Sequence, residues 1–378
     1  MNIWTTLIGE GWDIVNMSYT DRAAPIKKDI HKLGRQLGFS TAEEIDETFL
    51  SVALEESYTP RVDVVWYLDL QQLGLDTKQL ANYFGYEADD QFRRFPLVAF
   101  EIEASDPTTK TMEADLANLQ TIGAPFGVLI VDEDQEDGLY RRGKRILRTF
   151  RELYGHTNCI CLDRSHIMDL LTEGWNESIE QLNESHNVSA GTGGEREWSK
   201  QTRRYLVDLG KDIGFIVKED WIPHDLKHAY NQRRDLWSKI EQTTDYEQYT
   251  WAPGHQRKSF RGWRTYYTGS KVDLMWTIPY PESLQAFLRS IVQIDLDFET
   301  HTPLLRTGES VHPLFGFEIE SSAGKHAAGG VINLGVYPTI GRLVVPTESK
   351  KRRIEAKIQT YERALGIRNV ETVVMEHD

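Results

Sequence analysis

The chain has 378 residues, a length that favours two domains over one. Its 40% hydrophobic content is enough for cores of ordinary size, whereas its net charge of −15 argues against a protein held on nucleic acid by overall charge and leaves room only for a local basic surface. The sequence has no run of about 18 apolar residues, so we expect no membrane-spanning segment and no membrane partner.

The cysteine content favours a reducing compartment. Cys159 and Cys161 are the two cysteines, and in a strand they point to the same face. We interpret them as buried thiols, because two cysteines without a matching pair of histidines cannot form a tetrahedral zinc site. The N-terminus has no basic region before an apolar stretch, so we expect a cytoplasmic protein without a signal peptide.

The first half of the chain predicts an alternation of helices and strands. Apolar residues at positions 26, 30, 33 and 37 predict an amphipathic helix that ends near Gly38. An acidic stretch at 43–47 follows, then an apolar strand that contains Asp63. The remaining predicted elements are a strand over 97–102, a helix over 112–122, a strand over 127–131, a basic helix over 141–154 and a strand over 158–162.

The second half repeats this order. A helix over 198–215 is followed by a strand with Asp273, a strand with Glu318, a strand over 341–345 and a closing strand over 370–375. A repeat of this length predicts two tandem domains. We predict a first repeat over 1–183, a flexible linker over 184–197 and a second repeat over 198–378, with an aromatic and basic insertion at 221–263.

Each repeat carries one aspartate and a Glu-x-Glu pair on apolar, strand-like segments. The two sets are Asp63, Glu101 and Glu103, and Asp273, Glu318 and Glu320. Residues i and i+2 of a strand share a face, so each pair points together, and the aspartate on a neighbouring strand can converge with it. Three carboxylates suit a hard divalent cation, and without one they raise one another's pKa. A single copy is explained better by a solvated strand face and a hydrogen-bonded structural aspartate, but two copies in register favour a metal site in at least one repeat.

This order of elements resembles the PD-(D/E)xK nuclease superfamily, and its restriction-endonuclease-like members most of all. The segment Phe-Glu-Ile-Glu at 100–103 and 317–320 resembles a motif of several such nucleases. The resemblance implies an α/β fold of two tandem restriction-endonuclease-like domains, each a mixed central sheet flanked by helices. It also implies hydrolysis of DNA phosphodiester bonds with Mg2+ as cofactor and Mn2+ able to replace it. The chain is then a monomeric pseudo-dimer with two active sites, or a homodimer.

The resemblance also implies roles for the six acids. Asp63 and Asp273 match the metal-binding aspartate, and the first glutamate of each pair matches the second acid of the motif. The second glutamate of each pair stands where most members have a lysine. Lys110 and Lys325 follow the pairs by seven and five residues and are candidates to supply the missing positive charge.

Three basic segments are candidates for binding DNA. Their residues are Arg141, Arg142, Lys144 and Arg145; Lys350, Lys351, Arg352 and Arg353; and Arg257, Lys258, Arg261 and Arg264. The first two segments occupy equivalent places in the repeats, which favours phosphate contacts from both domains to one duplex. The third lies among aromatic residues that either stack on bases or pack in a core. Solvated helix faces explain the first two segments equally well.

Two other functions fit the sequence. In one, a single repeat cuts and the other binds DNA or an effector, which the insertion in the second repeat favours. In the other, the chain is a non-catalytic nucleic-acid-binding protein that retains the nuclease fold, which the net charge and the missing lysines favour. A glycosidase also uses paired acids, but neither the order of the repeat nor the arginines fit one.

Overall fold

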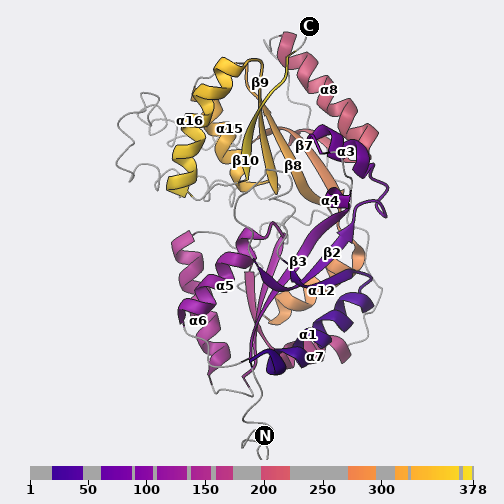
Figure 1. Cartoon of the computed structure of the whole chain (residues 1–378), viewed down its shortest axis with the longest axis vertical. Helices are drawn as coiled ribbons and strands as arrows, with labels where there is room; N and C mark the ends of the chain where they lie inside the picture. The colour runs from indigo at the N-terminus through magenta and orange to yellow at the C-terminus, as the bar shows by residue number, and fades with distance from the viewer. Residues whose placement is uncertain are drawn as a thin grey trace, which may run out of the picture. The chain divides into compact units, whose positions relative to one another are not determined.

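The fold is taken from a computed structural model of the chain (Figure 1). The structure describes residues 19–45, 61–86, 90–104, 109–133, 138–154, 159–172, 197–221, 271–294, 311–321, 325–365 and 369–376. Most of the predicted linker and insertion lies outside these ranges, so the predicted domain bounds stay predictions. No helix in the described residues is both long and apolar enough to cross a lipid bilayer.

The described residues form two compact units. The first unit takes its residues from 19–45, 61–68 and 96–172, and the second from 69–95 and the described ranges after 197. The segment 69–95 therefore belongs to the second unit, although it lies between two strands of the first sheet in the chain. Each unit contains one five-stranded mixed sheet with helices, which confirms the predicted α/β fold of two tandem domains.

The first sheet has the strand order β1-β2-β3-β4-β5. Its strands are β1 (Ser40–Ile45), β2 (Val62–Asp69), β3 (Arg94–Glu103), β4 (Phe126–Val131) and β5 (Cys159–Asp163). β1 and β2 are antiparallel, and β3, β4 and β5 are parallel. The described part of the acidic stretch, residues 43–45, thus belongs to an edge strand. The helices of this unit are α1 (Tyr19–Gln36), α5 (Thr109–Thr121), α6 (Leu139–Tyr154) and α7 (Arg164–Thr172).

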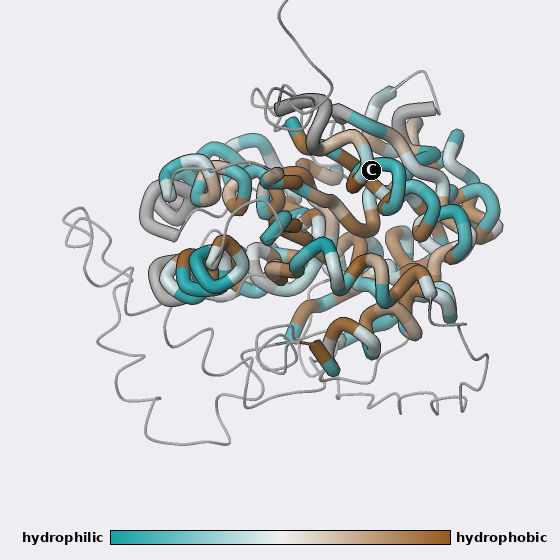
Figure 2. The backbone as a smooth tube through the Cα atoms, turned by 90° about the horizontal axis from the view of Figure 1, so that it is seen from below, coloured by the Kyte–Doolittle hydropathy of each residue, from teal (hydrophilic) through white to brown (hydrophobic). Residues whose placement is uncertain are grey.

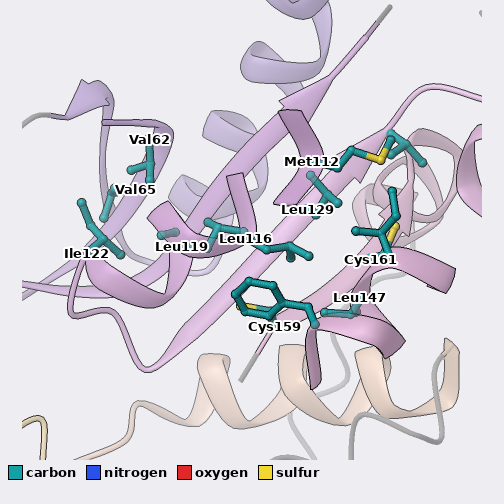
Figure 3. Packing of buried hydrophobic residues seen from close by; sticks show 14 of the residues in the cluster. Val62, Val65, Met112, Leu116, Leu119, Ile122, Leu129, Leu147, Cys159 and Cys161 are labelled. Carbon is teal, nitrogen blue, oxygen red and sulfur yellow. The ribbon is translucent and has the colours of Figure 1, made fainter. Parts of the chain in front are cut away.

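Helices α5 and α6 cover one face of this sheet (Figure 1). Leu116 and Leu119 of α5 pack with Leu147 of α6, with Leu129 of β4 and with the buried thiol of Cys161. Figure 3 shows the side chains of this cluster close together. Both cysteines belong to the cluster, which agrees with the prediction of buried thiols. Hydrophilic and hydrophobic residues alternate along the helical tubes in Figure 2, as expected for helices with one apolar face.

The second sheet repeats the first, with the order β10-β9-β8-β7-β6. Its strands are β6 (Ile216–Trp221), β7 (Val272–Pro279), β8 (Val311–Ile319), β9 (Ile340–Val345) and β10 (Val370–Val374). β6, β7 and β8 are antiparallel neighbours, and β8, β9 and β10 are parallel. The helices of this chain segment are α8 (Glu197–Ile213), α12 (Glu282–Ile294), α15 (Lys325–Val336) and α16 (Glu348–Leu365). Counted from the edge strand β1 or β6, both sheets place the aspartate strand second and the Glu-x-Glu strand third.

The segment 69–95 covers one face of the second sheet. It contains α3 (Thr77–Tyr83) and α4 (Asp90–Arg93), and the backbone N–H of Asp76 donates to Ile213 O at 2.7 Å, which ties it to the end of α8. The Tyr83 ring lies 5.5 Å from the Trp276 ring, measured between centroids. This contact face is opposite the one that carries Met275 and the α15 and α16 core, because successive residues of a strand point to opposite faces.

One contact is duplicated and fixes the opening helix of each unit on its sheet. Trp66 Nε1 donates to Ile30 O at 3.2 Å, and Trp276 Nε1 donates to Leu206 O at 3.1 Å. Both tryptophans are fully buried. The helical residue four positions after each acceptor is a glycine, and a Cβ on Gly34 would lie 2.6 Å from Trp66 Nε1. The missing side chain lets the helix approach the strand that carries the site aspartate.

Candidate acidic site

The three predicted acids of the first unit meet at one place on the sheet. Asp63 lies near the start of β2, and its Oδ2 accepts a hydrogen bond of 2.9 Å from the backbone N–H of Ile102 on β3. Ile102 is the residue between Glu101 and Glu103. The Asp63 carboxylate is therefore held against the backbone of the Glu-x-Glu pair.

The second unit has the same hydrogen bond. Asp273 Oδ2 accepts from the backbone N–H of Ile319 at 2.9 Å. Glu318 lies on β8, and Glu320 lies just after the strand, half-buried, with its backbone N–H bonded to Val344 O at 2.9 Å. The repeat found in the sequence is thus also a repeat of atomic contacts.

An asparagine anchors the first glutamate in each unit, a role that the sequence analysis did not assign. Asn118 of α5 donates to Glu101 Oε1 and to Arg61 O, both at 3.3 Å. Asn333 of α15 donates to Glu318 Oε1 at 3.3 Å and to Lys271 O at 2.9 Å. Each asparagine joins its helix to both site strands. The signal was present in the sequence, since the two asparagines occupy matching places in the repeat.

Burial excludes a solvated strand face for three of the glutamates. Glu101 is 7% exposed, Glu103 3% and Glu318 9%. Removing a carboxylate from water costs free energy unless the group is paired or hydrogen-bonded. These buried glutamates therefore need a compensating partner or serve a function.

A fourth acid joins the site in the first unit only. Asp115 lies on α5, three residues before Asn118, and its buried Oδ2 makes no hydrogen bond with the described residues. The equivalent position of the second unit, three residues before Asn333, is Gly330. A Cβ there would lie 3.2 Å from Glu318 Cγ, so that glycine gives Glu318 its space. Nothing in the motif pattern of the sequence points to Asp115.

The two buried glutamates of the first unit keep their protons at neutral pH. Burial raises the pKa of Glu101 to about 9, with repulsion from Asp115 and then Asp63 adding to the rise. Burial likewise raises the pKa of Glu103 to about 9, followed by its hydrogen bond to Asp115, in which Glu103 keeps the proton. Burial also raises the pKa of Asp115. Without a cation, both glutamates are neutral at pH 7.

A basic residue of the opening helix is paired with the aspartate in each unit. Lys27 Nζ of α1 lies 3.0 Å from Asp63 Oδ1. In the second unit Arg203 of α8 donates from Nη1 to Asp273 O at 2.8 Å and from Nη2 to Asp273 Oδ1 at 3.3 Å. Neither residue was among the predicted site residues, because each comes from a helix about 36 to 70 residues away in the chain.

The cation next to the second aspartate is held by a further acid. Arg203 Nη1 also lies 3.5 Å from Asp220 Oδ1 on β6, and Lys271 forms an ion pair with the same carboxylate. Asp220 has a backbone φ of 51°, a left-handed conformation that is uncommon for a residue with a side chain. In the second unit, Asp273 therefore belongs to a network of ion pairs with Arg203, Asp220 and Lys271.

The predicted role of Lys110 and Lys325 stays a prediction. Lys110 is exposed on the first turn of α5. Lys325 is the first residue of α15, and its side chain lies outside the described parts. The positive charge that the structure brings to the first site comes from Lys27 instead.

The predicted DNA-binding residues fall on two equivalent helices. On α6, Arg141 and Arg145 are exposed, whereas Arg142 and Lys144 are half-buried. On α16, Arg352 and Arg353 are exposed, Lys351 pairs with Glu355 at 3.8 Å, and Lys350 Nζ donates to Ser321 O at 2.5 Å. The remaining candidates, Arg257, Lys258, Arg261 and Arg264, lie outside the described residues.

The donor atoms of the first unit fit a hard divalent cation. Asp63, Glu101, Glu103 and Asp115 offer only oxygen, which Mg2+ and Mn2+ prefer, and the Asp115 Oδ2 lacks a partner among the described residues. No three His, Cys, Asp or Glu side chains in the described residues already have the arrangement of a metal site. Cation binding therefore requires Glu101 and Glu103 to lose their protons and the carboxyls to turn.

The second unit does not fit a cation in the same way. Its aspartate is bonded by Arg203 and by the Ile319 N–H, and Gly330 replaces the fourth acid. Comparison of the chain with models of protein families, with curated proteins and with solved structures gave no match. The resemblance to the PD-(D/E)xK nucleases therefore depends on the motif residues and on the order of elements that positions them.

Proposed function

We propose that the chain is a metal-dependent nuclease in which the first unit hydrolyses DNA phosphodiester bonds and the second unit binds DNA without cutting. The observation that carries the proposal is the convergence of Asp63, Glu101, Glu103 and Asp115 in the first unit. The Ile102 N–H holds Asp63, the Asn118 amide holds Glu101, and Glu103 is hydrogen-bonded to Asp115. The asymmetry of Asp115 against Gly330 and of Lys27 against Arg203 favours one active site over two.

The residues of the first unit have distinct roles in this proposal. The four acids would hold Mg2+ or Mn2+, which when bound supplies electrostatic stabilisation of the charge that develops on the phosphate. The Ile102 N–H and the Asn118 amide hold Asp63 and Glu101 next to each other, so the carboxyls that must deprotonate and turn towards a cation are already gathered at one place. The burial of Glu101 and Glu103 keeps the local dielectric low and strengthens their interaction with a cation.

Phosphate contacts in the proposal come from the exposed arginines of α6 and α16. Both helices follow the strand next to the Glu-x-Glu strand and present basic residues in their first turns. Such contacts position a duplex without reading its sequence, and they are local, so the net charge of −15 does not oppose them.

A matched pair of variants tests the proposal. Asp63→Asn and Asp273→Asn each keep an oxygen that can accept the N–H bond from the Glu-x-Glu strand, and each removes one charge. We expect supercoiled plasmid with Mn2+ or Mg2+ to be nicked by the wild type and by Asp273→Asn, but not by Asp63→Asn. Cutting by Asp63→Asn at the wild-type rate would refute the proposal, and loss of cutting in both variants would favour two coupled active sites.

A second function has its own support. The Lys27–Asp63 ion pair and the neutral glutamates satisfy the first site without a cation, as expected for a nucleic-acid-binding protein that retains the fold without the activity. Calorimetric titration with Mn2+ separates the two functions. Binding that Asp63→Asn abolishes supports the nuclease, and an absence of heat supports the binding protein.

A further inference from the structure

Both oxygens of the Asp63 carboxylate are engaged. The Ile102 N–H donates to Oδ2, and Lys27 Nζ lies 3.0 Å from Oδ1. The side chains of this ion pair are 12% and 21% exposed. A pair sheltered to this degree is screened less by solvent and salt than a surface pair. Oδ1 is the oxygen that a cation would use, because Oδ2 is held by the backbone of β3.

The second unit places an arginine at the same point. Lys27 and Arg203 each lie seven residues before the glycine under the buried tryptophan, Gly34 and Gly210. Arg203 makes its contacts with the main chain and side chain of Asp273 and with Asp220, so several bonds must break before it can leave. Lys27 contacts Asp63 with an ammonium group, a point charge on a flexible four-carbon chain that cannot form the two-point contact of a guanidinium.

We infer that Lys27 is a releasable counter-ion that competes with the divalent cation for Asp63 and so sets the cation affinity of the first unit, whereas Arg203 is its fixed equivalent and keeps the second unit closed to cations. The inference depends on the proposed function for the identity of the cation, and it adds the residue that regulates the site. The physical basis is that an ammonium group and a divalent cation repel each other and cannot share one carboxylate oxygen at contact distance.

The test is a calorimetric titration of the full chain with Mn2+ in the absence of DNA. The site is defined as the binding that Asp63→Asn abolishes, which removes the contribution of other acidic surface. We expect Lys27→Met to bind Mn2+ at least about tenfold more tightly than the wild type, because the competing charge is gone. We expect Lys27→Arg to bind at least about tenfold more weakly, because the guanidinium fork holds a carboxylate at two points.

Lys28→Met is the matched control. Lys28 is the exposed neighbour on the same helix, and its replacement changes the net charge by the same amount. We expect its Mn2+ affinity to equal that of the wild type. If Lys27→Met binds Mn2+ no more tightly than Lys28→Met, the inference is wrong, although the nuclease proposal still stands or falls with the Asp63→Asn cleavage result.

Two further outcomes complete the design. Lys27→Met leaves Asp63 without its counter-ion, so the thermal midpoint of each variant is measured in EDTA and in saturating Mn2+; a larger Mn2+-induced rise in Lys27→Met than in the wild type supports the inference, and an equal rise contradicts it. Lys27→Gln serves as a second variant with the same expectation. A wild-type chain that binds no Mn2+ refutes this inference and the cation-dependent function together.

Discussion

Replacing Glu101 by glutamine tests whether Glu101 is a buried, neutral acid or an ordinary surface carboxylate. Burial raises the pKa of Glu101 to about 9, against 4.5 for the free group, so the folded chain binds a proton that the unfolded chain has released. The free energy of unfolding therefore falls as pH rises from 4.5 towards 9. Each pH unit costs about 1.4 kcal/mol, which amounts to roughly 4 kcal/mol between pH 5 and pH 8. Glutamine is neutral throughout and escapes this cost.

We expect the difference in unfolding free energy between Glu101→Gln and the wild type to change with pH. In EDTA, Glu101→Gln gains up to about 4 kcal/mol relative to the wild type between pH 5 and pH 8, measured by urea unfolding followed by circular dichroism. The glutamine side chain can still accept the hydrogen bond from Asn118. The stability difference at pH 5 therefore measures only the small cost of packing the amide in place of the acid. Glu113→Gln, on the exposed face of α5, is the control and should show no such trend. A stability difference between Glu101→Gln and the wild type that stays constant with pH would refute the assignment of a buried, protonated Glu101.

Four other substitutions test the fold. Gly34→Ala and Gly210→Ala each force a Cβ into a buried tryptophan and should lower the unfolding free energy by about 1–3 kcal/mol in urea titrations; unchanged midpoints would contradict the close helix approach. His312 is hydrogen-bonded through both ring nitrogens, and burial lowers its pKa to about 3. The unfolded chain takes up this proton below about pH 6.5, so stability falls as pH drops towards 3, by roughly 2 kcal/mol at pH 5. His312→Gln should reduce that loss between pH 7 and pH 5, and an unaltered pH dependence would show that the histidine is not held neutral. Asp76 Oδ1 accepts from the Gln79 N–H at 2.9 Å at the start of α3, so Asp76→Ala should cost about 1 kcal/mol, checked by thermal unfolding against Asp76→Asn, which keeps the cap.

The sequence alone determined the alternation of helices and strands and its repetition. Apolar runs such as 126–131 are buried on both faces, and the stripe formed by Ile146, Leu147 and Phe150 can only be one side of a helix. These patterns depend on residues close together in the chain, so periodicity reveals them. The placing of Asp63 and the Glu-x-Glu pair on adjacent strands followed from the same patterns and from the resemblance.

Only the tertiary structure decided what surrounds those acids. Lys27, Asp115 and Asn118 reach the site from two different helices, and the segment 69–95 completes the second unit although it lies within the first repeat. Each of these contacts depends on how a helix is rotated and how closely it packs on its sheet. That packing is set by long-range contacts such as Trp66 against Gly34, and no local pattern of residues encodes which distant side chains it brings together.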